Sequence, residues 1–233
     1  MTERNRPTRF RYTGLARAFK ANGLTIVLLL LFAVSIGGQL IAGWRVTLED
    51  QLRHGAPTIG LAAYAASPEF VAAVFENWES EFLQMSTYVV LTAMLFQRGS
   101  AESKDPDSPP RDEDIVRQAL QPDAPRILRK GRFWRALYAR SLGLALAGLF
   151  AVSFAIHWLA SARAAGQEAL EHGEAAPTAL SYLADPQLWF ESFQNWQSEF
   201  LSTAVLVVFS IFLRQKESPE SKAVAAPHHE TGS

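Results

Sequence analysis

The chain repeats itself at an offset of 118 residues. Residues 24–104 align with residues 142–222 without a gap, and 30 of the 81 aligned pairs are identical. The longest shared stretch is NWESEFL, which begins at Asn77 and returns as NWQSEFL at Asn195. Identity at this level over an ungapped alignment indicates a tandem duplication. The sequence therefore predicts two similar folding units.

Each copy begins with a long apolar run. Residues 24–42 contain no charged side chain, and residues 142–160 contain only His157 as a titratable group. A membrane-spanning helix needs about 20 residues of this kind, so both runs predict spans. The first run follows a basic N-terminus, as a cleaved leader would. The first run is longer than the roughly 7–15 apolar residues of a leader. It also aligns with an internal segment that cannot be a cleaved leader, so we expect a retained helix.

The second apolar stretch of each copy is shorter. Residues 82–96 are short for a span, but the aligned residues 200–213 are plainly apolar, so we predict spans in both copies. Ser67-Pro68 and Asp185-Pro186 combine an N-cap residue with proline at the first helical position, which predicts the helix starts. His54-Gly55 and His172-Gly173 predict the ends of the preceding helices, where histidine meets open carbonyl groups.

These patterns predict an all-α membrane protein with four transmembrane helices, formed by tandem duplication of a helix–outer loop–helix unit. Two spans per copy predict a pseudo-two-fold axis along the membrane normal. The predicted segments are a basic cytoplasmic N-terminal segment (1–23), repeat 1 (24–104, spans at about 24–44 and 77–97, outer loop 45–76), a cytoplasmic linker ending in a basic interfacial segment (105–141), repeat 2 (142–222, spans at about 142–162 and 195–215, outer loop 163–194) and a disordered tail (223–233).

The distribution of basic residues predicts the topology. Six Lys and Arg residues precede the first span, ten lie between residues 98 and 141, and three follow from Arg214 onward, against two and one in the predicted outer loops. Positive segments stay on the cytoplasmic side, so both termini are expected in the cytoplasm and the protein in the bacterial inner membrane. The expected partners are the lipid bilayer, anionic lipids at the basic juxtamembrane segments and a second copy of the chain in a homo-oligomer. Nucleic acid is not expected beside a span.

The candidate polar site lies at the outer membrane boundary. Helical spacing places the polar residues of the second and fourth spans on one face, and it adds a polar position inside the first and third spans. The predicted site comprises Asn77, Ser80, Glu81, Gln84, Asn195, Ser198, Glu199, His157 and Gln39, with interfacial anchors Trp44, Trp78, Trp196, Arg45 and Arg163.

Two interpretations of this polar site remain open. The residues could line a pocket or ion path, or the two acids could lie at headgroup depth and pair with Arg45 and Arg163. Interfacial charge is cheap compared with charge at the bilayer centre, which favours the second interpretation. His157 could relay protons, but an interhelical hydrogen bond is the more common use of a polar residue inside a helical bundle.

No enzyme class is indicated. The chain has no cysteine, which excludes disulfides and thiolate chemistry. It contains no His-x-x-His or Glu-x-x-His spacing, no nucleophile elbow and no glycine-rich phosphate loop. We predict no catalytic residue, no metal site and no cofactor.

The chain resembles a bacterial integral-membrane family known as unknown-function family 6766. The resemblance covers all but the linker and tail, and the second copy departs from it in having Ser161-Ala162 where the first has Gly43-Trp44. It implies a membrane protein and supplies no activity, cofactor or partner. It rests on Asn22-Gly23-Leu24, Gly43-Trp44, Glu49-Asp50-Gln51 with His54-Gly55, the run NWESEFLQM from Asn77 to Met85 and the run FQRGSAESK from Phe96 to Lys104.

The function predicted from the sequence is that of a non-enzymatic structural or interaction protein of the bacterial envelope. Residues 45–80 and 163–198 would then form its working surface on the outer side. The alternative is a small channel or transporter for protons or small solutes. It would use Asn77, Glu81, Asn195, Glu199 and His157.

Overall fold

The computed structural model describes residues 15–109, 112 and 114–232. Residues 1–14 of the predicted basic N-terminal segment lie outside this part of the chain. The prediction of an all-α fold is confirmed, because the described residues form helices and no strand. The described residues through Phe70 make up one compact unit, and those from Val71 onward make up another.

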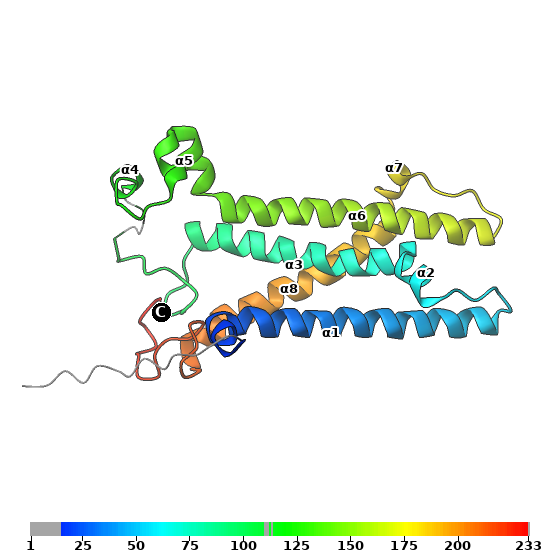
Figure 1. Cartoon of the computed structure of the whole chain (residues 1–233), viewed down its shortest axis with the longest axis horizontal. Coiled ribbons are helices and arrows are strands. Elements are labelled where there is room, and N and C mark those ends of the chain that lie inside the picture. Colours follow the sequence, from blue (N-terminus) through cyan, green and yellow to red (C-terminus); the bar gives the residue numbers. More distant parts are fainter. Residues whose placement is uncertain (1–14, 110–111, 113, 233) are drawn as a thin grey trace, which may run out of the picture. The chain divides into compact units, whose positions relative to one another are not determined.

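The first unit is built around helix α1 (Leu15–Arg53), shown in blue in Figure 1. The helix bends at Asn22, where φ is −132° and ψ is 21°. It ends as predicted: Gly55 adopts φ 63°, Ala56 N donates to Gln51 O over 2.8 Å, and the His54 ring bonds Asp50 O over 3.0 Å. This is the hydrogen-bonding pattern of a Schellman cap, in which a left-handed residue satisfies the last open carbonyls.

The short helix α2 (Leu61–Ala65) packs against α1. Trp44 Nε1 donates to Ile59 O over 2.9 Å, and Tyr64 is buried. A side chain at Gly43 would collide with the Tyr64 hydroxyl, so the close approach of α2 requires glycine there. The predicted outer loop 45–76 is therefore largely helical: it contains the end of α1, all of α2 and the start of α3.

Helices α6 (Ser141–Glu171) and α7 (Ala179–Tyr182) form a similar arrangement in the second unit. Gly173 adopts φ 72°, and Glu174 N donates to Ala169 O over 2.7 Å, which confirms the predicted end of α6. Trp158 Nε1 donates to Ala179 O over 2.7 Å. Tyr182 and Leu188 form the apolar core here with Ala162.

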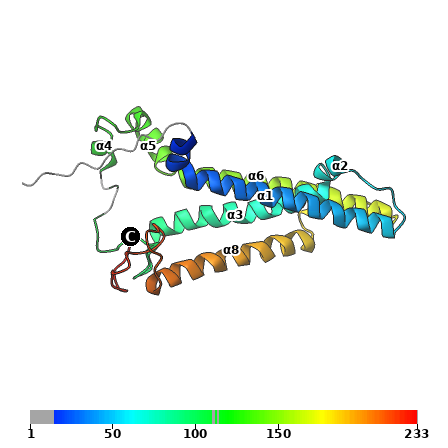
Figure 2. The same cartoon turned by 60° about the horizontal axis from the view of Figure 1, so that its bottom comes forward.

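Helices α3 (Pro68–Met94) and α8 (Pro186–Phe212) start at the predicted capping residues. Ser67 Oγ accepts a hydrogen bond from Phe70 N at 3.2 Å, and Asp185 Oδ1 accepts one from Gln187 N at 2.8 Å. Within the second unit, α3 lies beside α6 and has α8 on its other side (Figure 1 and Figure 2).

Both helices end three residues before the predicted boundaries at 97 and 215. The amide of Gln97 donates to Ser103 Oγ over 2.8 Å, and that of Gln215 donates to Ser221 Oγ over 2.9 Å. Because these amides bond to side-chain hydroxyl groups, they no longer bond to carbonyls of the preceding helical turn. The chain can then turn away from each helix.

Two described helices are long and apolar enough to cross a membrane, judged by length and composition alone. They are the stretch Phe19–Arg53 of α1, and α6. The first halves of α3 and α8 contain acidic and amide side chains, which lower their apolar character. Two of the four predicted spans therefore meet this criterion.

The linker contains three short helices, α4 (Ile115–Gln118), η1 (Arg126–Lys130) and α5 (Arg132–Tyr138). Phe133 and Trp134 are exposed, and the Lys130 ammonium lies 5.8 Å from the centre of the Trp134 ring. The basic and aromatic residues thus share one short helical segment immediately before α6.

The tail, which we predicted to be disordered, folds around a buried lysine. Lys222 is 2% exposed, and its ammonium group donates to the carbonyls of Gly99, Pro227, His228 and Glu230 at 2.6–3.2 Å. A side chain at Gly99 would lie 2.6 Å from the His228 carbonyl. The prediction of disorder was based on the polar composition of the tail, which does not reveal these carbonyl contacts.

We expect Lys222→Met to release the tail, because buried carbonyl groups without a donor cost about 1–3 kcal/mol. Lys104 is the matched control. It occupies the equivalent position in the first copy and is exposed, and its ammonium group donates to Ala93 O. Limited proteolysis with a protease that does not cleave at lysine, followed by mass spectrometry, should show faster cleavage after residue 222 in Lys222→Met only. Equal cleavage in both variants would contradict this role of Lys222.

Candidate functional site

A buried histidine lies at the centre of the second unit. His157 is fully buried on α6, together with Ser153 one turn before it and Ser161 one turn after it. The i, i+4, i+8 spacing seen in the sequence therefore forms a polar face inside the protein. The ring atom Nδ1 lies 3.0 Å from Glu79 Oε2 on α3. The prediction that His157 makes an interhelical hydrogen bond is confirmed.

Glu79 is also fully buried and joins three helices. One carboxyl oxygen accepts from His157 of α6, and the other accepts from Ser192 Oγ of α8 over 2.7 Å. Ser192 has no exposed surface either. A buried carboxylate is strongly unfavourable unless it is paired and hydrogen-bonded, and here each oxygen has its own donor. This network connects α3, α6 and α8 at one point.

The second ring nitrogen of His157 lies close to a further carboxylate, that of Glu191. Nε2 lies 3.5 Å from Glu191 Oε2 and is buried without a hydrogen-bond partner in the described part of the chain. Glu76 accepts a hydrogen bond from Asn195 Nδ2, which also donates to Glu191 O over 3.2 Å. One ligand-type atom each from Glu76, His157 and Glu191 all lie within 4.8 Å of one another.

The electrostatics of this cluster are unusual for a buried site. Three carboxyl groups surround a single imidazole. Burial raises the pKa of Glu76, whereas the neighbouring imidazole lowers the pKa of Glu191. The site therefore concentrates acidic groups around one imidazole ring, an arrangement that favours a bound cation or proton.

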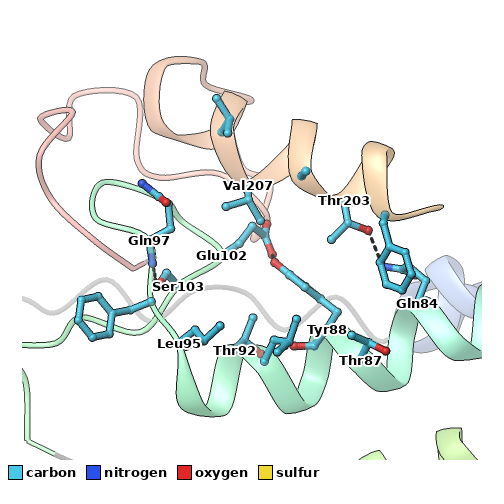
Figure 3. Close-up of a pocket in the computed structure, with 15 residues that line it drawn as sticks. Gln84, Thr87, Tyr88, Thr92, Leu95, Gln97, Glu102, Ser103, Thr203 and Val207 are labelled. Carbon is cyan, nitrogen blue, oxygen red and sulfur yellow. Dashed lines mark hydrogen bonds between the residues drawn. The ribbon is translucent and has the colours of Figure 1, made fainter. Parts of the chain in front are cut away.

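A separate cavity of about 420 Å³ lies between α3 and α8 (Figure 3). Gln84 Nε2 donates to Thr203 Oγ1 over 2.6 Å at one end, and the Tyr88 hydroxyl donates to Glu102 Oε2 over 3.0 Å farther along. The remaining lining is mostly apolar. It comprises Leu91, Leu95, Phe96, Phe200, Ala204, Val207 and Val208 with Thr87, Thr92, Gln97 and Ser103.

The predicted polar stripe does not form one site. Glu81 and Glu199 approach each other, Glu81 being exposed and Glu199 half-buried. In the described part of the chain no ion pair joins Glu199 to Arg163, and the pairing stays a prediction. Residues two apart on a helix point about 160° away from each other, so Glu81 faces away from the side of α3 that carries Glu79.

The other predicted residues are dispersed. Asn77 Nδ2 donates to Ala73 O of its own helix, and the hydroxyls of Ser80 and Ser198 likewise bond carbonyls one turn earlier. Gln39 is half-buried on α1 in the first unit. Of the predicted site residues other than His157, Asn195 contacts the His157 cluster, through its hydrogen bond to Glu76.

The predicted aromatic anchors make specific packing contacts. Trp196 lies in an aromatic cluster with Phe150, Trp189 and Phe193, at ring-centre distances of 5.3–6.5 Å. Trp78 packs against Phe75, with ring centres 4.9 Å apart. Arg45 and Arg163 are exposed.

Four residues of the cluster were missed in the sequence: Glu76, Glu79, Glu191 and Ser192. Each occupies a position at which the two copies differ, because the aligned residues are Gln194, Gln197, Ala73 and Val74. His157 follows the same rule, since it aligns with Gln39. The positions at which the two copies differ mark this site in the sequence. The shared residue Glu81, in contrast, lies on the opposite face of α3.

The chain matches no curated protein and no solved structure. One sequence family matches it over nearly its whole length, residues 15–233. This match agrees with the resemblance seen in the sequence motifs. The chain therefore belongs to the family described as a domain of unknown function (DUF6766).

Proposed function

We propose that the chain is an integral protein of the bacterial cytoplasmic membrane in which α1, α3, α6 and α8 all cross the bilayer. The length and composition of α1 and α6 support two of these spans. For α3, Glu79 is a residue that would oppose insertion if it faced lipid. Its carboxyl group is enclosed by protein and carries two hydrogen bonds, so it does not face lipid.

The proposal includes a tandem duplication, which the positions of the helices support. α3 and α8 begin 118 residues apart, at Pro68 and Pro186, and end 118 residues apart, at Met94 and Phe212. The last residues of α1 and α6, Arg53 and Glu171, have the same offset. This offset equals that of the sequence repeat.

A pseudo-two-fold axis between α3 and α8 is supported by contacts between equivalent residues. Glu81 approaches Glu199, and Glu102 approaches Glu220. Each pair joins a residue to its counterpart in the other copy. Self-contact of this kind is expected only for residues close to a two-fold axis.

The proposed orientation places the linker and both termini in the cytoplasm. The segment that holds Lys130, Phe133 and Trp134 exposes basic and aromatic side chains together just before α6. Such a segment suits the headgroup region of an anionic leaflet, which makes the bilayer and its anionic lipids the proposed partners.

The proposed function is that of a structural or interaction protein of the envelope. The observation that carries it is the exposure of large apolar side chains in the outer segment 163–198. Leu180 is 76% exposed, Phe190 63% and Phe193 59%. Large exposed apolar side chains in a segment proposed to lie outside the bilayer suggest an interaction surface, and a partner protein or a second copy of the chain would bind here.

Conduction of protons or small solutes is the second candidate. The approach of Glu81 to Glu199 and the cavity between α3 and α8 favour it. Most of that cavity's lining is apolar, and His157 lies in a different cluster from Glu81, so a continuous polar path is not supported.

We expect a reporter that is active only in the periplasm to work when fused after Gly55 and to be silent when fused after Lys104. The second fusion is decisive, because a protein with only α1 and α6 as spans would hold Lys104 outside. Fusions after Gly173 and at the C-terminus should be active and silent, respectively. Activity after Lys104 would contradict the four-span proposal.

We expect the purified protein in proteoliposomes to conduct no protons or small ions above the level of empty vesicles, because the lining between α3 and α8 is apolar. The double variant Glu81→Gln with Glu199→Gln should behave in the same way in a pH-sensitive dye assay. Flux in the wild type that this double variant abolishes would replace the interaction proposal with the transport one.

A further inference from the structure

We propose that Glu76, His157 and Glu191 bind a divalent transition-metal ion of the Zn²⁺ class. These residues come from α3, α6 and α8, so the ion would hold three helices together. The inference goes beyond the function proposed above and does not depend on the direction in which the chain crosses the membrane.

The spacing of the three side chains suits such an ion. His157 Nε2 lies 3.5 Å from Glu191 Oε2, and the three ligand atoms lie within 4.8 Å of one another. Ligands bound tetrahedrally at about 2.0–2.1 Å lie roughly 3.4 Å apart. The histidine–carboxylate distance already matches, and rotation of the half-buried Glu76 side chain would bring the third ligand closer.

The strongest evidence is the state of the His157 ring. Nε2 is fully buried, lies 3.5 Å from Glu191 Oε2 and makes no hydrogen bond within the described residues. A buried polar atom without a partner is unfavourable. A metal ion between Nε2 and the carboxylate oxygens would remove this penalty.

The surroundings of the ligands resemble those of established metal sites. Histidine ligands usually donate their second N–H to a carboxylate, which fixes the tautomer and orients the ring. Here Nδ1 bonds Glu79, and Ser192 holds the other oxygen of that carboxylate. Asn195 orients Glu76 by a hydrogen bond. The Nε2 lone pair is thereby directed towards Glu76 and Glu191.

The ligand set indicates the class of ion. One imidazole nitrogen and two carboxylate oxygens suit Zn²⁺, Mn²⁺ or Fe²⁺, whereas Mg²⁺ and Ca²⁺ prefer oxygen ligands alone. Three protein ligands leave a fourth position for water. The ion would also balance the charge of three clustered carboxyl groups.

The sequence analysis predicted no metal site, because it searched for ligands at short local spacing. The proposed ligands are instead far apart in the chain and converge only when three helices pack. Their counterparts in the other copy are Gln194, Gln39 and Ala73. The equivalent position in the other half therefore retains no ligand set, and we expect one ion per chain.

The test is binding of Zn²⁺ to the full chain, purified in detergent without a polyhistidine tag and stripped with a chelator. Titration calorimetry should show one Zn²⁺ per chain, with Mg²⁺ unable to compete. His157→Gln and Glu191→Ala, which introduce the residues of the other copy, should each weaken binding at least about tenfold. X-ray absorption should show one nitrogen and oxygen ligands at about 2.0–2.2 Å.

His172→Gln is the control, because it makes the same substitution at an exposed histidine on the end of α6. It should bind as tightly as the wild type. Glu191→Ala leaves the His157–Glu79 bond in place, so it tests binding even where His157→Gln fails to fold. The proposal is overturned if the wild type binds no Zn²⁺, as expected for an imidazolium that only bridges Glu79 and Glu191. It is also overturned if folded Glu191→Ala binds as tightly as the wild type.

Discussion

The burial of the Glu79 carboxyl group is the constraint on which the second unit depends. No water reaches this group, so its hydrogen-bond partners must come from the protein, and they come from two other helices. Helices α6 and α8 can satisfy Glu79 only when His157 and Ser192 meet it at the same point. This requirement fixes the register of three long helices whose other contacts are largely non-directional.

The two halves of the chain that align in sequence carry an asymmetric site. Three structural features occur in both halves: the helix caps, the backbone amides that bond a serine hydroxyl after α3 and α8, and the buried tyrosines Tyr64 and Tyr182. The buried polar residues do not recur. Under the proposed duplication, substitutions in either half can build a site without disturbing the shared caps. Glu81 and Glu199, which are shared by the two halves, instead approach each other from α3 and α8.

Local chemistry accounts for what could be predicted from the sequence. Ser67, Asp185, Gly55 and Gly173 determine helix ends through bonds within a few residues, so a single sequence reveals them. The folded tail and the His157 cluster could not be predicted in this way. Lys222 bonds a carbonyl 123 residues away, and Glu79 bonds partners 78 and 113 residues away. Helical spacing identifies which residues share a face, but it does not say which helix that face meets.

The free energy of unfolding of two serine variants on α8 tests the central role of the buried carboxyl group most directly. Ser192→Ala removes a donor from Glu79, whereas Ser198→Ala removes an exposed hydroxyl that bonds only its own helix. We expect Ser192→Ala to destabilise the protein by about 1–3 kcal/mol, and Ser198→Ala to change stability by less than about 0.5 kcal/mol. Equal effects, or a larger effect of Ser198→Ala, would show that the shared motif and not the Glu79 network holds the helices together.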